Sequence, residues 1–261
     1  MKNIAFYGGG NISQAVIEGL ISSGFNKDNI FFIERNVVNQ RKLKKLKIKK
    51  INNKTKIDLF ILAVKPKDAI DAYKDILNRY SNPKVISLVA GIKSNKYRHL
   101  DKNVEFLRAM PNTSSKYGLG ITAVFNSTFK KSNLKKVIGI MKKVGIVITV
   151  DSESKIDTFT GIIGSGPAYF FHLLQSYEKK LLTLSNGDKK IVNNIMSNLM
   201  KGVGMSIEKD TNLDNLIKAV ASKKGTTEAG LKSFKLNKLS NRFEKGLNAA
   251  IKRSKEISNE F

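Results

Sequence analysis

Short apolar runs alternate with amphipathic stretches along the first 150 residues of this 261-residue chain. Apolar runs without polar alternation predict strands buried on both faces, whereas apolar residues three or four apart predict helices. Strands and helices that alternate along a chain indicate a mostly parallel sheet covered on both faces. The predicted strands are 2–7, 29–34, 58–64, 84–90, 104–108, 120–125 and 145–150, and the predicted helices among them are 11–23, 37–46 and 130–144.

The pattern changes near residue 151, beyond which no run predicts a strand. Helical spacing of apolar residues takes over and predicts helices at 169–185, 188–209, 213–221, 227–234 and 238–258. We therefore predict an α/β fold of two domains. Residues 1–152 form a Rossmann-type, doubly wound, mostly parallel sheet, and residues 153–261 form an all-helical domain.

The amino-acid composition excludes several kinds of site and partner. The chain has no cysteine and only two histidines, so we expect no disulfide, no thiolate ligand and no metal site. Its net charge of +26 comes from 40 Lys and only 7 Arg, spread along the chain without a nucleic-acid-reading motif, and we expect a solvated lysine surface and no nucleic-acid partner. No apolar run reaches the ~18 residues of a membrane helix, and the first residues lack a signal-peptide pattern. We expect a cytoplasmic protein without membrane contact.

A glycine-rich stretch follows the first predicted strand. The letters G-G-G-N-I-S-Q-A fit the pattern G-x-G-x-x-[G/A] at Gly8, Gly10 and Ser13. Such glycines allow a tight turn and a close approach of a pyrophosphate, and the following helix start offers free N–H groups. The second strand ends in Glu34, where an acid binds the adenosine ribose. The predicted dinucleotide-binding residues of this motif are Gly8, Gly9, Gly10, Asn11, Ile12, Glu34 and Arg35.

The preferred dinucleotide stays open at this point. Glu34 would repel a 2′-phosphate and favour NADH. Arg35 and Asn36, directly after it, could hold that phosphate and favour NADPH. We therefore predict NADPH or NADH as the cofactor.

Five blocks of the sequence, in order, resemble pyrroline-5-carboxylate reductases over essentially the whole chain. This family reduces the cyclic imine Δ1-pyrroline-5-carboxylate to L-proline with NADH or NADPH, the last step of proline biosynthesis. Its members pack helical domains into dimers or assemblies of dimers, so the resemblance implies substrate binding and dimerisation for 153–261. The blocks are 4–15; L-A-V-K-P at 62–66; S-L-V-A-G at 87–91; R-A-M-P-N-T at 108–113 with G-L-G-I-T at 118–122; and G-S-G-P-A-Y at 164–169 with G-T-T at 225–227.

The resemblance also assigns roles to single positions. It implies that Ala63, Val64, Lys65 and Pro66 lie at a strand end against the dinucleotide, and that Val89 and Ala90 line the nicotinamide side. The substrate-binding residues that it implies are Met110, Pro111, Gly164, Ser165, Ser222, Gly225, Thr226 and Thr227. Two positions depart from the usual family pattern, namely Ser114 in place of proline and Ile163 in place of serine.

The stretch A-S-K-K-G-T-T-E-A-G at 221–230 leads into a predicted helix. Gly225 permits an unusual backbone angle, and free N–H groups at the helix start attract a carboxylate. By similarity the substrate carboxylate lies near Thr226 and the ring nitrogen near Thr227, which is the predicted catalytic residue. The family commonly has Ser-Pro-Gly-Gly where this chain has Ser-Lys-Lys-Gly. A positive φ at Lys224 would cost about 1 kcal/mol or more relative to glycine.

Two alternatives remain at the level of sequence. The altered Ser-Lys-Lys-Gly loop leaves room for a related reductase that acts on a six-membered cyclic imine. The charge of +26 leaves room for a non-catalytic protein that binds dinucleotides or nucleic acid.

Overall fold

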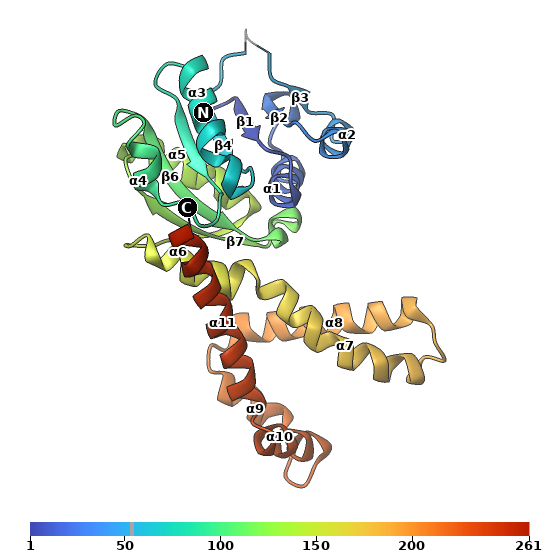
Figure 1. Ribbon diagram of the computed structural model, residues 1–261. Helices are drawn as coiled ribbons and strands as arrows, with labels where there is room; N and C mark the ends of the chain where they lie inside the picture. The colour runs from blue at the N-terminus through green and yellow to red at the C-terminus, as the bar shows by residue number, and fades with distance from the viewer. Residues whose placement is uncertain (53–54, 261) are drawn as a thin grey trace. The chain divides into compact units, whose positions relative to one another are not determined.

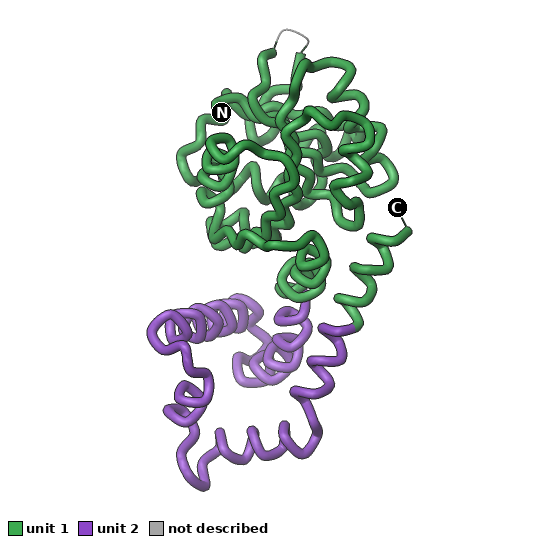
Figure 2. Tube along the Cα trace, turned by 90° about the vertical axis from the view of Figure 1, so that its left-hand side faces the viewer, with its two compact units in different colours: residues 1–167, 249–261 green, residues 168–248 purple. Residues whose placement is uncertain are grey.

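The chain forms two compact units. The computed structural model describes residues 1–52 and 55–260. One unit comprises Met1–Pro167 with Ala249–Phe261, and the other comprises Ala168–Asn248 (Figure 2). We call them the sheet unit and the helical unit.

Eight strands build the sheet unit in the order β3-β2-β1-β4-β5-β6-β7-β8. Neighbouring strands are parallel except β6 and β7, so the predicted mostly parallel, doubly wound sheet is confirmed. The edge strand β3 was not predicted, because it consists of two exposed lysines without apolar signal. The strands are β1 (Ile4–Tyr7), β2 (Ile30–Ile33), β3 (Lys49–Lys50), β4 (Leu59–Leu62), β5 (Lys84–Ser87), β6 (Glu105–Pro111), β7 (Gly120–Asn126) and β8 (Gly145–Thr149).

Helices cover both faces of this sheet (Figure 1). Those that apolar spacing predicted, α1, α2 and α5, are present, whereas α3, α4 and α6 were not foreseen. A π-helical turn, Thr160–Gly164, follows α6. The helices are α1 (Asn11–Ser22), α2 (Val37–Lys45), α3 (Ala69–Arg79), α4 (Ser94–Arg98), α5 (Lys131–Met141) and α6 (Ser154–Phe159).

Two apolar cores lie on opposite faces of the sheet. On one face, Leu20 of α1 packs with Phe32 of β2, and on the other, Tyr73 of α3 packs with Phe106 of β6. Strand β4 is buried on both faces, as its unbroken L-F-I-L run predicts for a central parallel strand. Each fully buried side chain of this kind contributes about 1.5–3 kcal/mol relative to exposure.

The last helix, α11 (Leu239–Glu260), returns to the sheet unit. The buried Ser258 hydroxyl donates to Asp157 Oδ1 at 2.7 Å. Ile257 lies so close to Gly91 that a Cβ there would meet its side chain at 2.5 Å. The end of α11 is therefore part of the packing of the sheet unit.

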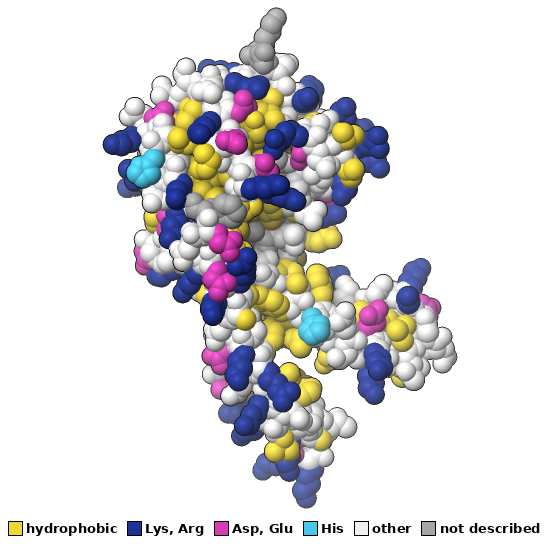
Figure 3. Space-filling model, in the orientation of Figure 1, with side chains coloured by type: hydrophobic (Ala, Val, Ile, Leu, Met, Phe, Trp, Pro, Cys, Tyr) yellow, Lys and Arg dark blue, Asp and Glu magenta, His cyan; other side chains and the backbone are white. Residues whose placement is uncertain are grey.

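The helical unit exposes most of its apolar side chains. Asp188 and Asn212 cap α8 and α9 by accepting N–H bonds. Of the hydrophobic side chains in residues 168–248, all of them described, only Val192 is buried. Figure 3 shows apolar side chains on the surface of the α7–α8 pair. The helices are α7 (Gly166–Leu184), α8 (Lys189–Lys209), α9 (Leu213–Val220), α10 (Thr226–Leu236) and the start of α11.

The described residues contain neither a membrane span nor a cluster of metal ligands. Within 1–52 and 55–260, no helix is both long and apolar enough to cross a membrane. In the same residues, no three or more His, Cys, Asp or Glu side chains are grouped so that they could hold a metal ion. The face in Figure 3 carries scattered Lys and Arg side chains.

Candidate functional site

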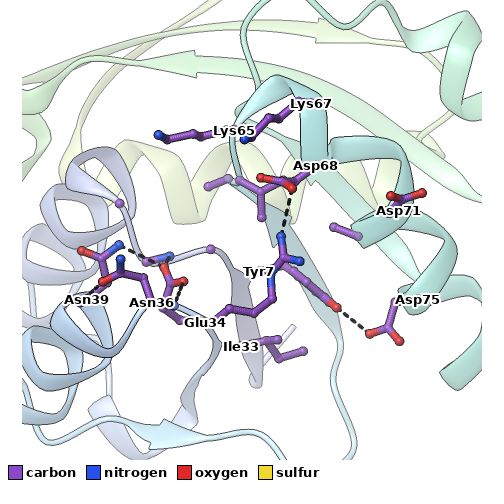
Figure 4. Close-up of a pocket in the computed structure, with 17 residues that line it drawn as sticks. Tyr7, Ile33, Glu34, Asn36, Asn39, Lys65, Lys67, Asp68, Asp71 and Asp75 are labelled. Carbon is purple, nitrogen blue, oxygen red and sulfur yellow. Dashed lines mark hydrogen bonds and ion pairs between the residues drawn. The ribbon is translucent and has the colours of Figure 1, made fainter.

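A cavity of about 530 Å³ opens where β1, β2 and β4 end in the sheet unit. The carboxyl edge of a doubly wound sheet is where such folds bind dinucleotides. Seventeen residues line it, and Figure 4 shows their side chains around the opening. They are Tyr7, Gly8, Gly9, Gly10, Ile33, Glu34, Arg35, Asn36, Asn39, Ala63, Val64, Lys65, Lys67, Asp68, Asp71, Ala72 and Asp75.

The glycine loop between β1 and α1 forms one wall. Gly8 has φ +102°, and a Cβ there would lie 2.6 Å from the Ala63 carbonyl oxygen, so only glycine fits. Ser13 donates its hydroxyl to the Gly8 carbonyl at 2.7 Å and holds the loop on the helix. A Cβ at Gly10 would meet no described atom within 4 Å. The start of α1 therefore faces open space, which fits the approach of a pyrophosphate.

Glu34 is held at the base of the cavity. Its carboxylate accepts the N–H of Gly9 at 2.6 Å and the N–H of Asn36 at 2.7 Å. The Asn39 side chain donates a third bond at 3.2 Å. The acid predicted for ribose binding is thus hydrogen-bonded to the glycine loop, and it cannot turn away without leaving two backbone donors unpaired.

One ion pair and one hydrogen bond join the opposite wall to the base. Arg35 Nη2 lies 3.0 Å from Asp68 Oδ1. Tyr7 donates its hydroxyl to Asp75 Oδ2 at 2.5 Å, and Arg79 pairs with the other carboxylate oxygen at 2.8 Å. Burial, and then the hydrogen bond to Asp75, raise the pKa of the Tyr7 phenol, so this residue is a neutral donor.

Eight of the predicted cofactor residues line this one cavity. Pro66 begins a 3₁₀ turn beside it, and Asn11 and Ile12 begin α1. Val89 is buried after β5, and Ala90 packs against the cluster of Met110, Ala123 and Ile156. The predicted residues that line the cavity are Gly8, Gly9, Gly10, Glu34, Arg35, Ala63, Val64 and Lys65, and those that do not are Asn11, Ile12, Pro66, Val89 and Ala90.

The wall formed by α3 and the residue before it was not predicted. Asp68, Asp71 and Asp75 are three and four residues apart, a spacing that places them on one face of a helix. This spacing could have revealed them if the helix after the predicted third strand had been recognised. The other overlooked lining residues are Tyr7, Ile33, Asn39, Lys67 and Ala72.

The predicted substrate residues occur in both units. Met110 and Pro111 end β6 and are buried in the sheet unit. Gly164 ends the π-helical turn, and Ser165 donates its N–H to the Thr160 carbonyl at 3.1 Å. The remaining four, Ser222 and 225–227, belong to the helical unit.

The loop before α10 has a positive φ at Lys224, the case for which the sequence predicted a cost relative to glycine. Lys224 has φ +59°, the left-handed region. Its N–H donates to the Glu228 carboxylate in the first turn of α10. Gly225 itself has an extended backbone with φ −85°, so the unusual angle that the sequence allowed for Gly225 lies at Lys224 instead. Thr226 and Thr227 form the first helical turn, whose N–H groups have no acceptor within the helix.

A buried ion pair lies near the predicted nicotinamide side. Arg108 of β6 is 1% exposed, and its Nη1 lies 2.9 Å from Glu153 Oε1. Glu153 also accepts the N–H of Ser94 at 2.6 Å and its hydroxyl at 2.9 Å. Among the described residues, nothing pairs with Nε or Nη2 of Arg108. Glu153 therefore joins α4, β6 and the segment before α6 at one point.

Family models match both parts of the chain. A model described as NADP oxidoreductase, coenzyme F420-dependent, matches residues 3–91. A model described as pyrroline-5-carboxylate reductase dimerisation matches residues 153–257. The first match includes the glycine loop and Glu34, and the second includes the whole helical unit.

Known proteins resemble the chain along its length. Pyrroline-5-carboxylate reductase 1 of Bacillus subtilis is 32% identical over 273 residues, which cover 100% of this chain and 91% of the relative. A solved pyrroline-5-carboxylate reductase from Coxiella burnetii is 30% identical, with a TM-score of 0.84 and 98% of both chains covered. A Plasmodium falciparum pyrroline carboxylate reductase with NADP bound has the same TM-score and coverage at 24% identity, which shows the shared fold.

The fold, the cavity and the sequence relation agree with one another. The sheet order, the glycine loop and the acid after β2 build a dinucleotide cavity, and the relatives share both halves of the chain. The chain belongs to the pyrroline-5-carboxylate reductase family and is an NAD(P)H-dependent oxidoreductase.

Proposed function

We propose that this chain reduces Δ1-pyrroline-5-carboxylate to L-proline, with the dinucleotide in the cavity of the sheet unit. The observation that carries the proposal is the cavity at the ends of β1, β2 and β4, in a chain related over its whole length to pyrroline-5-carboxylate reductases. A reduced nicotinamide supplies the hydride when it is bound, so the protein needs to position two reactants and to manage one proton.

The sheet unit binds and orients the dinucleotide in this proposal. Gly8 and Gly10 let the pyrophosphate approach the start of α1, and Glu34 faces the adenosine ribose. The strand end at 63–66 and the residues 89–90 and 110–111 form the wall toward the nicotinamide. Met110 is 8% exposed and Pro111 is buried, so this part of the wall is apolar and keeps water away from the hydride path.

The start of α10 binds the substrate in this proposal. The N–H groups of 225–227 receive the substrate carboxylate, because the first turn of a helix offers free donors and a favourable dipole. The half-buried Thr227 hydroxyl meets the ring nitrogen, and the exposed Thr226 lies nearer the carboxylate. A threonine hydroxyl is a weak acid, so Thr227 acts by positioning and hydrogen bonding. Ser222 of the same unit is a further proposed substrate-binding residue, and Gly164 and Ser165 are those proposed in the sheet unit.

Oxidation of NADH and NADPH by the purified chain with Δ1-pyrroline-5-carboxylate tests the proposal. Thr227→Val removes the hydroxyl at nearly constant shape and should lower kcat/KM about 10- to 100-fold, the value of a hydrogen bond to a charged group. Cofactor affinity should not change, because the dinucleotide cavity lies in the other unit. Thr226→Val is the matched control and should act mainly on KM. Full activity in Thr227→Val would reject the assigned role, and an inactive wild-type chain that binds cofactor would reject the reaction.

The helical unit forms a homodimer in the same proposal. Phe171 is 67% exposed, Val220 is 71% exposed and Leu236 is 73% exposed, a state that costs free energy in water. The family model described as dimerisation covers this part of the chain and supports the assignment. We propose that a second copy covers these side chains, and that residues 1–152 and 153–261 act as the dinucleotide domain and the substrate and dimerisation domain.

Light scattering coupled to size exclusion tests the dimer. Phe171→Glu places a charge on α7 and should give monomers or soluble aggregates, whereas Lys179→Glu on the same helix should leave the mass unchanged. A monomeric wild-type chain at micromolar concentration would reject the dimer. The predicted cytoplasmic location belongs to this proposal, and cell fractionation would test it.

A further inference from the structure

The dinucleotide cavity is acidic, although the chain is strongly basic. Its charged lining residues are Glu34, Asp68, Asp71 and Asp75 against Arg35, Lys65 and Lys67, whereas the whole chain has 47 Lys and Arg against 21 Asp and Glu. A basic lining would attract the additional phosphate of NADPH, whereas this lining carries one more acid than base. The excess of carboxylates therefore bears on which dinucleotide binds, because NADPH differs from NADH by a phosphate on the adenosine 2′ oxygen.

Glu34 is the first residue that favours NADH over NADPH. Its two oxygens offer about four acceptor positions, and Gly9, Asn36 and Asn39 use three of them. One position remains for a ribose hydroxyl. A 2′-phosphate in that place would face the carboxylate as a like charge, and Glu34 cannot withdraw without breaking its bonds to two backbone N–H groups.

Asp68 is the second such residue, and it acts through Arg35. The Arg35 side chain is 83% exposed and could reach a 2′-phosphate from the end of β2, but its guanidinium pairs with Asp68 at 3.0 Å. Asp68 precedes α3 on the facing wall, so the ion pair crosses the cavity (Figure 4). A 2′-phosphate could still bind the other N–H groups of Arg35, but it would then lie beside the Asp68 carboxylate, which repels it and offsets the charge of the arginine.

We infer that this cavity selects NADH over NADPH, with Glu34 as the acceptor for the ribose hydroxyl and Asp68 as a specificity-determining residue whose carboxylate offsets the charge of Arg35 toward a 2′-phosphate. The inference rests on the proposed dinucleotide site. It resolves the opposed signals of Glu34 and Arg35 in the sequence, because the structure pairs the arginine and leaves the glutamate facing the cavity.

Equilibrium binding of NADH and NADPH to the purified full chain, without substrate and at one fixed ionic strength, tests the inference. Wild-type protein should bind NADH about tenfold or more tighter than NADPH, the range of a hydrogen bond to a charged group. Asp68→Asn should lower the Kd for NADPH about two- to fivefold, the range of an exposed ion pair, and leave the Kd for NADH within about twofold. Glu34→Gln should weaken NADH and move the ratio toward NADPH by about tenfold.

Asp71→Asn is the matched control, because it removes the same charge from the same wall without touching the Arg35 ion pair. A ratio that shifts in Asp68→Asn but not in Asp71→Asn supports the role of the pair. Equal shifts in both variants overturn it in favour of a general charge effect. If Glu34→Gln does not fold, the two aspartate variants still decide the question.

The same measurements distinguish a failure of the NADH selectivity from a failure of the proposed reaction. Equal affinity for the two dinucleotides, or tighter NADPH binding, in a chain that reduces Δ1-pyrroline-5-carboxylate overturns the selectivity alone. Tighter NADH binding in a chain that does not reduce this imine rejects the reaction and supports the selectivity.

Discussion

Replacing Glu153 by glutamine should destabilise the sheet unit far more than its position near the surface suggests. The substitution keeps the shape of the side chain and removes the negative charge opposite Arg108, which is 1% exposed. It also puts an amide donor where the carboxylate accepts from Ser94 or from Arg108. Arg108 would then carry its charge in the interior with Nε and Nη2 already unpaired among the described residues.

The size of the effect follows from burial. Removing one partner of a buried ion pair costs roughly 3–5 kcal/mol, because the other charge stays desolvated. Glu153 is 21% exposed, so water relieves part of this cost, and we expect the lower end, about 3 kcal/mol. At about 2–4 °C per kcal/mol for a chain of this size, Tm should fall by about 6–12 °C.

The neighbouring ion pair supplies the control. Asp151 and Lys155 lie 2.8 Å apart, nearly the same distance as Glu153 and Arg108, but their side chains are 74% and 58% exposed. Asp151→Asn should leave Tm unchanged within error, since exposed pairs contribute little. Thermal unfolding by circular dichroism should be followed at one protein concentration, because self-association would make Tm concentration-dependent.

A double substitution makes the test sharper. Arg108→Met removes the buried charge, so the variant that combines it with Glu153→Gln should be more stable than Glu153→Gln alone. Equal Tm losses in Glu153→Gln and Asp151→Asn would refute the argument from burial. A double variant that is less stable than both single variants would refute the argument from an uncompensated charge.

Three further outcomes are expected. Gly8→Ala should lower Tm and abolish NADH binding in a fluorescence titration, because its Cβ would collide with the backbone. Gly10→Ala should keep Tm and only weaken binding, because its Cβ would meet no described atom. The same Tm for both variants would contradict this reasoning. Lys224→Gly should stabilise the chain by about 0.5–1 kcal/mol in urea unfolding by relieving φ +59°, and Lys223→Gly should not. Burial raises the pKa of Tyr97 from 10.0 to about 12, so the stabilisation it gives is complete below pH 10 and is lost as pH rises from 10 toward 12; urea midpoints in Tyr97→Phe should fall less over that range.

The strands and the glycine loop could be predicted because each depends on the residues of one short segment. Four apolar residues in β4 mark a strand buried on both faces, and Gly8 and Gly10 stand where a tight turn must be. The predicted sheet was therefore confirmed in all but its two-residue edge strand. Helix α3 was not predicted. Its cavity face is held by two contacts, one between Asp68 and Arg35 and one between Asp75 and Tyr7.

Other features could not be read because they join distant residues. Arg108 and Glu153 are 45 residues apart, and nothing in either neighbourhood shows that one compensates the other. Ser258 and Asp157 are 101 residues apart, so the return of α11 to the sheet unit was not foreseen. The left-handed backbone at Lys224 could be stated only as one of two possibilities, since a lysine in the sequence does not indicate a positive φ.

The return of α11 has a consequence for synthesis on the ribosome. The sheet unit needs Ile257 against Gly91 and Ser258 against Asp157, yet the helical unit, Ala168–Asn248, must be translated between these partners. At about 5–20 residues per second, roughly eighty residues take about 4–16 s. During that interval the nascent sheet unit exposes the surface around Gly91 that α11 later covers. A stalled or truncated product that lacks the end of α11 would keep this surface exposed to proteases.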